Sequence, residues 1–189
     1  EFLDRVNYIV DELEVCQKAD GEGYIGAVQN TKEIFTEQIA KGDIDPQRFA
    51  LNGLWAPFYI HHKLMAGLRD AYHLCGNEKA LSIEKRFADW LYTIVADLND
   101  KQIQKMLYTE YGGINETLYD LYADTQNEKY LELANVFYDN ELLKPLSRGK
   151  EVLAGKHGNT QIPKLIGLAR KYEVTGKKKA KKTATFFWN

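Results

Sequence analysis

The sequence has little cysteine, little net charge and no long apolar run. Its two cysteines, Cys16 and Cys75, form no spaced metal motif, and a disulfide between them would depend on the fold. No apolar stretch approaches the roughly 18 residues that a membrane-spanning helix needs. The formal net charge of −2 gives no overall attraction to nucleic acid or to an acidic membrane. With 44% hydrophobic residues, the chain is expected to form one globular domain or part of one.

Several catalytic and targeting motifs are also missing. The chain has no phosphate-binding loop, dinucleotide fingerprint or two-histidine zinc helix. It has no Gly-x-Ser-x-Gly nucleophile turn either. The first residues, Glu1–Arg5, lack the basic and apolar regions of a signal peptide. The chain also starts without methionine, as a cut or processed chain would.

The clearest positive feature is an internal repeat. Three segments share a leucine, a tyrosine four positions later and a phenylalanine further on, each 50 residues apart by subtraction: Leu68, Tyr72 and Phe87; Leu118, Tyr122 and Phe137; Leu168, Tyr172 and Phe187. A leucine and a tyrosine four positions apart lie on the same face of a helix. The pattern therefore predicts tandem helical hairpins, with repeat units at about 58–100, 108–148 and 158–189.

The residues between the two helices of each hairpin support this interpretation. Gly76 and Gly176 follow the first helix, where a left-handed residue is wanted. Gln126 fills that place in the middle unit, at a cost of roughly 1–2 kcal/mol if the backbone is left-handed. Asn77 and Asn127 are the predicted N-caps of the second helices.

Upstream of the repeats, a helix is expected from Phe2 to about Lys18 and another from Thr31 to Ala40, with a loop between them. Strands are expected to be at most minor. The predicted fold is all-α, a single domain over residues 1–189 whose hairpins stack as a solenoid or close into a ring. Three bulky aromatic residues, Phe186–Trp188, lie at the end of the sequence. They predict that more chain follows and that this apolar edge self-associates when exposed.

The loops before the first helices resemble a known family. Trp55–Leu68, Gly112–Glu116 and Gly155–Lys164, with Gly23–Gly26 upstream, resemble the β-L-arabinofuranosidase-type glycoside hydrolases of family 127 over essentially the whole chain. The resemblance implies part of an (α/α)6 toroid of six helical hairpins, followed by β-sandwich domains. It also implies removal of arabinofuranose from glycans, and by class it weakly favours a secreted or periplasmic enzyme.

The resemblance also implies residues that this chain does not show. The family uses a glutamate as acid/base and a cysteine nucleophile held at a zinc site of cysteines and a glutamate. Neither Cys16 nor Cys75 matches these motifs, and Cys75 occupies the repeat position of Thr125 and Thr175. Both cysteines are therefore expected to be structural, with no cofactor in this chain. The chain alone is expected to hydrolyse little or nothing.

Two adjacent histidines, His61 and His62, open the first helix of the first full unit. Adjacent helical side chains point about 100° apart, so only one is expected to face a sugar. An imidazole can both donate to and accept from a sugar hydroxyl. Which histidine does so is open, and a helix-start histidine satisfied by the backbone is the structural alternative.

Acidic and amide side chains flank the Gly112–Gly113 turn. Glycoside cleavage needs paired carboxylates, which Glu110 and Glu116 could supply. Asn115 or Glu116 binding a sugar hydroxyl is the preferred functional interpretation, with Glu116 as catalytic acid the less favoured one. In the first turn of a helix, Glu116 is also explained by the helix dipole alone.

Polar residues precede the third unit. His157, Asn159 and Gln161 alternate, and in an extended segment they would point the same way and line a groove. The alternative is a turn with Asn159 or Thr160 as N-cap.

Two further groups have open roles. Trp55, Phe58 and Tyr59 could stack on a sugar ring or form core. The basic run Lys177–Lys182 lacks interleaved aromatic residues, so a solvated helix face is favoured over nucleic-acid or membrane binding.

The preferred hypothesis is one wall of a site for arabinofuranose-containing oligosaccharides, built from His61 or His62, Asn115, Glu116, His157 and Gln161. Neither nucleic acid nor a membrane is an expected partner. A non-catalytic helical-repeat scaffold or binding module is the first rival. The second is a complete enzyme using Glu110 or Glu116 as acid, which predicts turnover by this chain alone.

Overall fold

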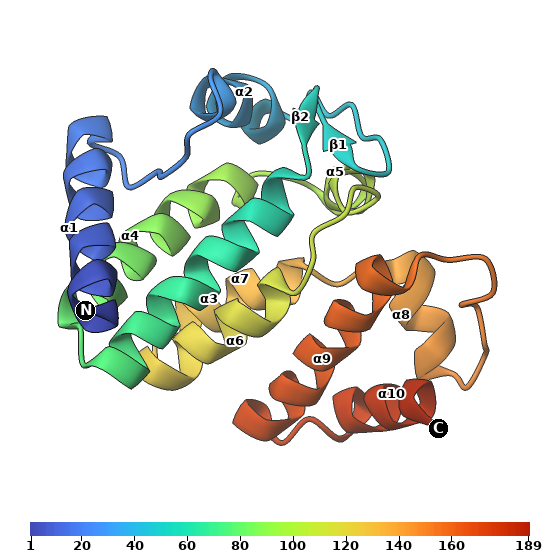
Figure 1. Cartoon of the computed structure of the whole chain (residues 1–189). Coiled ribbons are helices and arrows are strands. Elements are labelled where there is room, and N and C mark those ends of the chain that lie inside the picture. Colours follow the sequence, from blue (N-terminus) through green and yellow to red (C-terminus); the bar gives the residue numbers. More distant parts are fainter. The chain divides into compact units, whose positions relative to one another are not determined.

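A computed structural model describes all residues, 1–189, and the fold is all-α, as predicted (Figure 1). The only strands form a two-stranded hairpin, β1 (Ala50–Leu51) and β2 (Leu54–Trp55). No helix has the length and apolar character to cross a membrane. The α-helices are α1 Phe2–Asp20, α2 Thr31–Glu37, α3 Pro57–Cys75, α4 Glu78–Val95, α5 Asp100–Met106, α6 Ile114–Thr125, α7 Glu128–Val136, α8 Asn140–Ser147, α9 Gly158–Thr175 and α10 Lys178–Trp188.

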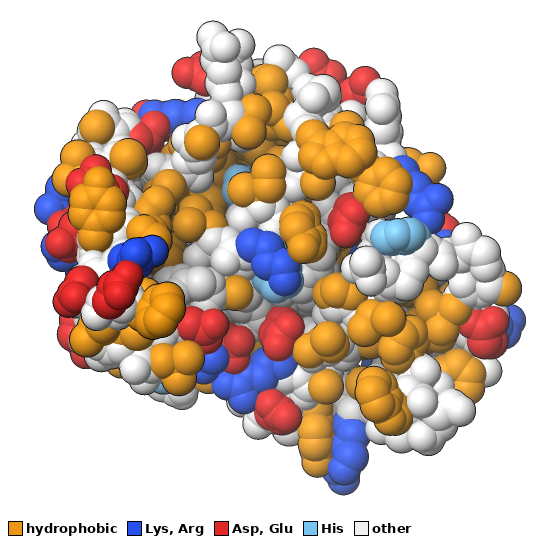
Figure 2. All heavy atoms as spheres, viewed as in Figure 1, with side chains coloured by type: hydrophobic (Ala, Val, Ile, Leu, Met, Phe, Trp, Pro, Cys, Tyr) orange, Lys and Arg blue, Asp and Glu red, His pale blue; other side chains and the backbone are white.

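The chain divides into two compact units. The first contains residues 1–43 and 63–98, and the second contains residues 44–62 and 99–189. The boundary falls inside α3, whose first turns belong to the second unit. On the face seen in Figure 2, acidic and basic side chains are scattered among hydrophobic ones, which agrees with the small net charge.

In the first unit, a buried glutamine holds the loop after α1 against α4. The Gln17 side-chain amide donates to the carbonyl oxygens of Gly23 at 2.8 Å and Ile83 at 3.0 Å. Gly23 has a φ of +97°, and a Cβ there would lie 2.5 Å from the carbonyl oxygen of Arg86. Glycine is therefore required at this point of the Gly23–Gly26 segment.

The second unit contains the hairpins α6–α7 and α9–α10, with α8 packed on α10. One part of its core is a ring cluster in which Phe137 lies 5.3 Å from Phe58 and 5.9 Å from Tyr111, measured between ring centroids. A second part joins α8, α9 and α10 through the buried residues Leu142, Leu143, Leu146, Leu165, Leu168 and Ala180. This packing fixes the helix starts on which the candidate site is built.

The residues between paired helices confirm the sequence expectations. The first helices end at residues 75, 125 and 175, and their partners begin at 78, 128 and 178. Gly76, Gln126 and Gly176 are all left-handed, with φ of 66°, 56° and 67°. Asn77 and Asn127 both cap the following helix through their side-chain oxygens. The 50-residue spacing of the sequence is thus kept in the backbone.

Several short elements were not predicted. The expected helix 31–40 ends at Glu37 and is followed by a 3-10 turn, Ile39–Lys41. The β-hairpin turns at Asn52–Gly53, both with positive φ, which is the commonest two-residue hairpin pair. Helices α5 and α8 were missed, although Asn99 and Asp139 cap them through side-chain hydrogen bonds.

A glycine permits the close crossing of α6 and α9. The Asn115 side chain from α6 donates to the carbonyl oxygen of Lys164 on α9, at 3.1 Å. A Cβ at Gly167, one turn along α9, would lie 2.2 Å from the Asn115 amide nitrogen. Asn115 is buried in this contact. Its observed role is therefore to lock two helices together.

This crossing generates a stability prediction with a matched control. Gly167→Ala should lower the free energy of unfolding by about 1–3 kcal/mol, because Asn115 must be displaced. Gly67→Ala, at the same repeat position on an exposed part of α3 with open space around it, should stabilise by about 0.5–1 kcal/mol. Urea unfolding of both variants measures the difference. Equal effects at the two positions would contradict the packing argument.

Candidate functional site

One histidine borders the Gly112–Gly113 turn. The backbone N–H of Gly113 donates to Nδ1 of His62 at 3.1 Å, in a buried contact. An Nδ1 that accepts a hydrogen bond carries no proton, so in neutral His62 the proton lies on Nε2. Gly112 has a φ of +56°, and a Cβ there would lie 2.9 Å from His62 Nδ1 and 3.0 Å from a ring carbon of Tyr59. The glycines are needed because this ring approaches the backbone so closely.

The structure brings Glu116 to the same place. A Cβ built on Gly113 would lie 3.1 Å from His62 Nε2 and 3.4 Å from Glu116 Oε2. The imidazole and the carboxylate therefore both approach the same side of Gly113. Glu116 is also in the first turn of α6, as predicted, where the helix dipole favours a carboxylate. His62 from α3 and Glu116 from α6 thus meet at the same glycine.

The neighbouring histidine has a different environment. His61 is buried, and its ring meets the ring of Phe58 edge to face, with centroids 5.9 Å apart. Burial lowers the pKa of His61 from 6.5 to about 3, because the charged imidazolium would lose its hydration. His61 is therefore neutral at physiological pH and belongs to the core. Of the two histidines, His62 is the one at the glycine turn.

Glu110, at the other side of the turn, is largely buried and holds a neighbouring loop. Its backbone N–H donates to the carbonyl oxygen of Arg48 at 2.9 Å. The Thr109 hydroxyl lies against the carbonyl oxygens of Gln47 and Ala50. Residues 109–110 thus fix the loop that carries Arg48.

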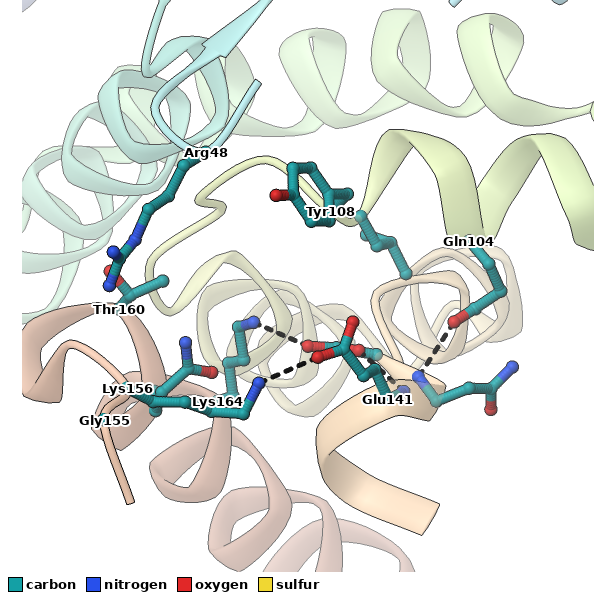
Figure 3. Close-up of a pocket in the computed structure, with 12 residues that line it drawn as sticks. Arg48, Gln104, Tyr108, Glu141, Gly155, Lys156, Thr160 and Lys164 are labelled. Atoms are coloured by element: carbon teal, nitrogen blue, oxygen red, sulfur yellow. Dashed lines mark hydrogen bonds and ion pairs between the residues drawn. The ribbon is translucent and has the colours of Figure 1, made fainter. Parts of the chain in front are cut away.

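A polar pocket of about 480 Å³ lies within the second unit (Figure 3). It contains Gln161, one of the residues proposed from the sequence, whose Oε1 is buried without a hydrogen-bond partner. The residues around it come from the loop before β1, from α5, α8 and α9, and from the loop before α9: Arg48, Gln104, Leu107, Tyr108, Asp139, Asn140, Glu141, Gly155, Lys156, Thr160, Gln161 and Lys164.

The prediction that the side chains of His157, Asn159 and Gln161 point the same way from an extended segment is wrong. Helix α9 begins at Gly158, so Asn159 and Gln161 are already helical, and side chains two positions apart on a helix diverge by about 200°. His157 itself is the N-cap residue, instead of Asn159 or Thr160. Its Nδ1 lies 3.1 Å from the Thr160 hydroxyl, and only Thr160 and Gln161 of this group line the pocket.

Ion pairs hold the pocket's charged side chains in place. Lys164 Nζ lies 2.8 Å from Asp139 Oδ2 and 4.5 Å from the ring centroid of Tyr111. Only 4% of the Lys164 side chain is exposed. Burial lowers the pKa of Lys164, and Asp139 opposes this shift. At the rim, Lys156 pairs with Glu141 at 2.8 Å, and Figure 3 shows both pairs as dashed lines.

Exposed aromatic residues lie beside the loop that carries Arg48. The Phe49 ring lies 5.8 Å from Trp55 and 5.9 Å from His157, measured between centroids, and the Arg48 guanidinium lies 5.3 Å from it. Trp55 is 71% exposed, whereas Phe58 is fully buried. Of the three aromatic residues that could form either a platform or the core, Phe58 lies in the core, whereas Trp55 and Tyr59, which is 39% exposed, reach the surface.

Comparison with protein families matches residues 1–189 to the family described as beta-L-arabinofuranosidase, GH127 catalytic domain. The chain belongs to this family. Comparison with curated proteins finds no match. The resemblance seen in the loops is confirmed, and the all-α hairpins agree with part of the (α/α)6 domain of GH127.

The zinc implied by the GH127 family is not matched by the residues of this chain. No group of three or more histidine, cysteine, aspartate or glutamate side chains could hold a metal ion. Both cysteines are free thiols, with Cys16 exposed on α1 and Cys75 partly buried at the end of α3. Cys75 therefore lies at a helix end as expected, while Cys16 is at the surface instead of packed.

The buried His61 predicts a specific pH dependence. Its folded-state pKa of about 3 lies below the ordinary value of 6.5, so its stabilising contribution is present above pH 6.5 and is lost as the pH falls towards 3. Lowering the pH from 7 to 5 should therefore lower the free energy of unfolding by about 2 kcal/mol, because the histidine binds a proton in the unfolded chain but not in the folded one. His61→Phe should remove this part of the slope in pH-dependent urea unfolding. His73→Phe, at an exposed position, is the control, and an unchanged slope in His61→Phe would refute the assignment.

The Lys164–Asp139 pair predicts strong coupling. Asp139→Asn keeps an N-cap for α8 but leaves Lys164 buried without a counter-charge, which should cost about 3–5 kcal/mol. Lys164→Met combined with Asp139→Asn should recover much of this loss, because no unpaired charge remains. A double-mutant cycle by chemical unfolding measures the coupling. Additive effects would show that the pair is energetically unimportant.

Proposed function

We propose that the second unit supplies part of the arabinofuranoside-binding wall of a GH127 glycoside hydrolase. The observation that supports this proposal is the convergence of His62 and Glu116 on Gly113, at the Gly112–Gly113 turn. The family membership supplies the substrate class. The wall binds the sugar, and the cleavage step needs groups that this chain does not supply.

The chemistry of the pair suits a sugar hydroxyl, which can both accept and donate. Because Gly113 uses Nδ1 of His62, the proton of the neutral ring lies on Nε2, while the Glu116 carboxylate can only accept. A hydroxyl that accepts from His62 can at the same time donate to Glu116. Charge-assisted hydrogen bonds of this kind are stronger than neutral ones.

Other residues have supporting roles in the proposal. Gln161 offers its buried Oε1 as an acceptor in the polar pocket. His157 and Trp55 belong to the aromatic group around Phe49, where an exposed indole can stack on a sugar ring. His61 and Asn115 are positioning residues that act through packing, without touching the sugar.

In this proposal the chain binds the glycan without cleaving it. Neither cysteine belongs to a cluster that resembles the family's nucleophile and zinc site. The rival in which Glu110 or Glu116 acts as the acid of a complete enzyme predicts turnover of an aryl arabinofuranoside by this chain. That turnover would disappear in Glu116→Gln.

Binding of methyl β-L-arabinofuranoside to the 189-residue chain tests the proposal. His62→Asn keeps an acceptor for Gly113 but loses the Nε2–H donor, and Glu116→Gln loses the charge. Each should weaken binding about 5–10-fold, as expected for one lost hydrogen bond. Two-dimensional NMR titration measures the dissociation constants and locates the shifted amides.

Glu128→Gln is the matched control. Glu128 is also a carboxylate in the first turn of a helix, but it lies on α7 and accepts a hydrogen bond from the Tyr122 hydroxyl. It should lose a similar helix-dipole contribution and keep full affinity. Equal affinities in all variants, or no binding by the wild-type chain, would refute the proposed site.

A further inference from the structure

A second hollow, of about 310 Å³, lies on the second unit between α7, α9 and α10. It is independent of the glycine turn and of the polar pocket, with which it shares no residue. The residues that line it are Leu131, Asn135, Tyr138, Leu168, Lys171, Thr175, Lys177, Lys179, Ala180 and Thr183. Three of them are lysines and none is a carboxylate.

Lys171 is the innermost of these cations. Its ammonium group donates to Oδ1 of Asn135 and lies 5.7 Å from the ring centroid of Tyr119. The Tyr119 hydroxyl donates to the same Asn135 oxygen, at 3.0 Å. Burial lowers the pKa of Lys171, and Lys177 and Lys179 lower it further. The lining itself combines three lysines with no carboxylate, so no acidic group of the hollow neutralises them.

Other parts of the lining are apolar side chains and threonine hydroxyls that already donate to backbone carbonyl oxygens. Leu168 and Ala180, which belong to the buried core cluster, also line the hollow. The Thr183 hydroxyl donates to the carbonyl oxygen of Lys179 at 2.9 Å, and the Thr175 hydroxyl likewise donates to that of Lys171. A neutral sugar would find few free partners here, whereas a negatively charged group with an apolar body would match both parts.

We propose that this hollow binds a small organic anion with an apolar body, of the aromatic carboxylate class. The carboxylate lies among Lys171, Lys177 and Lys179, and the ring covers Leu168 and Ala180. The volume is at the lower end of the range for ligand pockets, which suits a single ring. Part of the basic run 177–182 thereby gains a role beyond that of a solvated helix face.

The same basic run supplies matched controls. Lys178 and Lys182 are exposed on α10 but do not line the hollow, so replacing them removes the same charge from the same helix. If the site is specific, Lys179→Gln should weaken binding of the anion more than Lys178→Gln does. If the anion is only attracted to a basic surface, the two variants should weaken binding equally.

The experiment is an NMR titration of the 189-residue chain with benzoate, with benzamide and with inorganic phosphate. Benzoate should bind saturably with shifts confined to α7, α9 and α10. Neutral benzamide should bind about tenfold more weakly, because it loses the charge. Phosphate, which lacks the apolar body, should also bind more weakly than benzoate.

Lys177→Gln and Lys179→Gln should each weaken benzoate binding about 2–5-fold, while Lys178→Gln and Lys182→Gln should leave it unchanged. Lys177 and Lys179 are exposed, so these variants should fold normally. Equal affinity for benzamide, equal loss in the Lys178→Gln control, or absence of saturable benzoate binding would each overturn the proposal.

Discussion

Lys164 is the residue on which the organisation of the second unit depends. Its carbonyl oxygen accepts from Asn115 on α6, and its ammonium group pairs with Asp139, the N-cap of α8. The same ammonium lies over the ring of Tyr111, next to the Gly112–Gly113 turn. A buried charge must keep its partner, because an unpaired one would cost several kcal/mol. One residue of α9 thus ties the start of α8 to Tyr111 and Asn115, which lie on the two sides of the Gly112–Gly113 turn.

The fold could be predicted where it depends on local periodicity. The hairpins were predicted from a leucine and a tyrosine spaced by four residues, with glycine or asparagine at the helix ends. The same pattern predicted the left-handed residues between the helices, including Gln126. Helices α5 and α8 are seven and eight residues long, too short for a periodic pattern to be distinct. Their capping residues, Asn99 and Asp139, were the usable signal.

The site was less predictable because it depends on which neighbour each side chain meets. His61 and His62 have the same local sequence environment, and only the packing of Phe58 and the approach of Gly113 separate them. The repeat itself has the same limit. Gly67 and Gly167 occupy equivalent positions of the repeat. Gly67 has open space where a Cβ would be, whereas the Asn115 side chain occupies that place at Gly167. Periodicity specifies the hairpin, whereas the partner of each face is set by tertiary contacts.

The two hollows of the second unit show how the pairing of lysine determines what a surface can bind. In the polar pocket, Lys164 and Lys156 each meet a carboxylate, so their charges are largely neutralised and the remaining groups suit hydroxyls. In the other hollow, Lys171 meets only the neutral Asn135 and the ring of Tyr119. Neither of these partners is a counter-charge that would neutralise the Lys171 ammonium. The two surfaces thus differ in how their lysines are paired, which is why we propose a neutral glycan as the ligand of one and an anion as the ligand of the other.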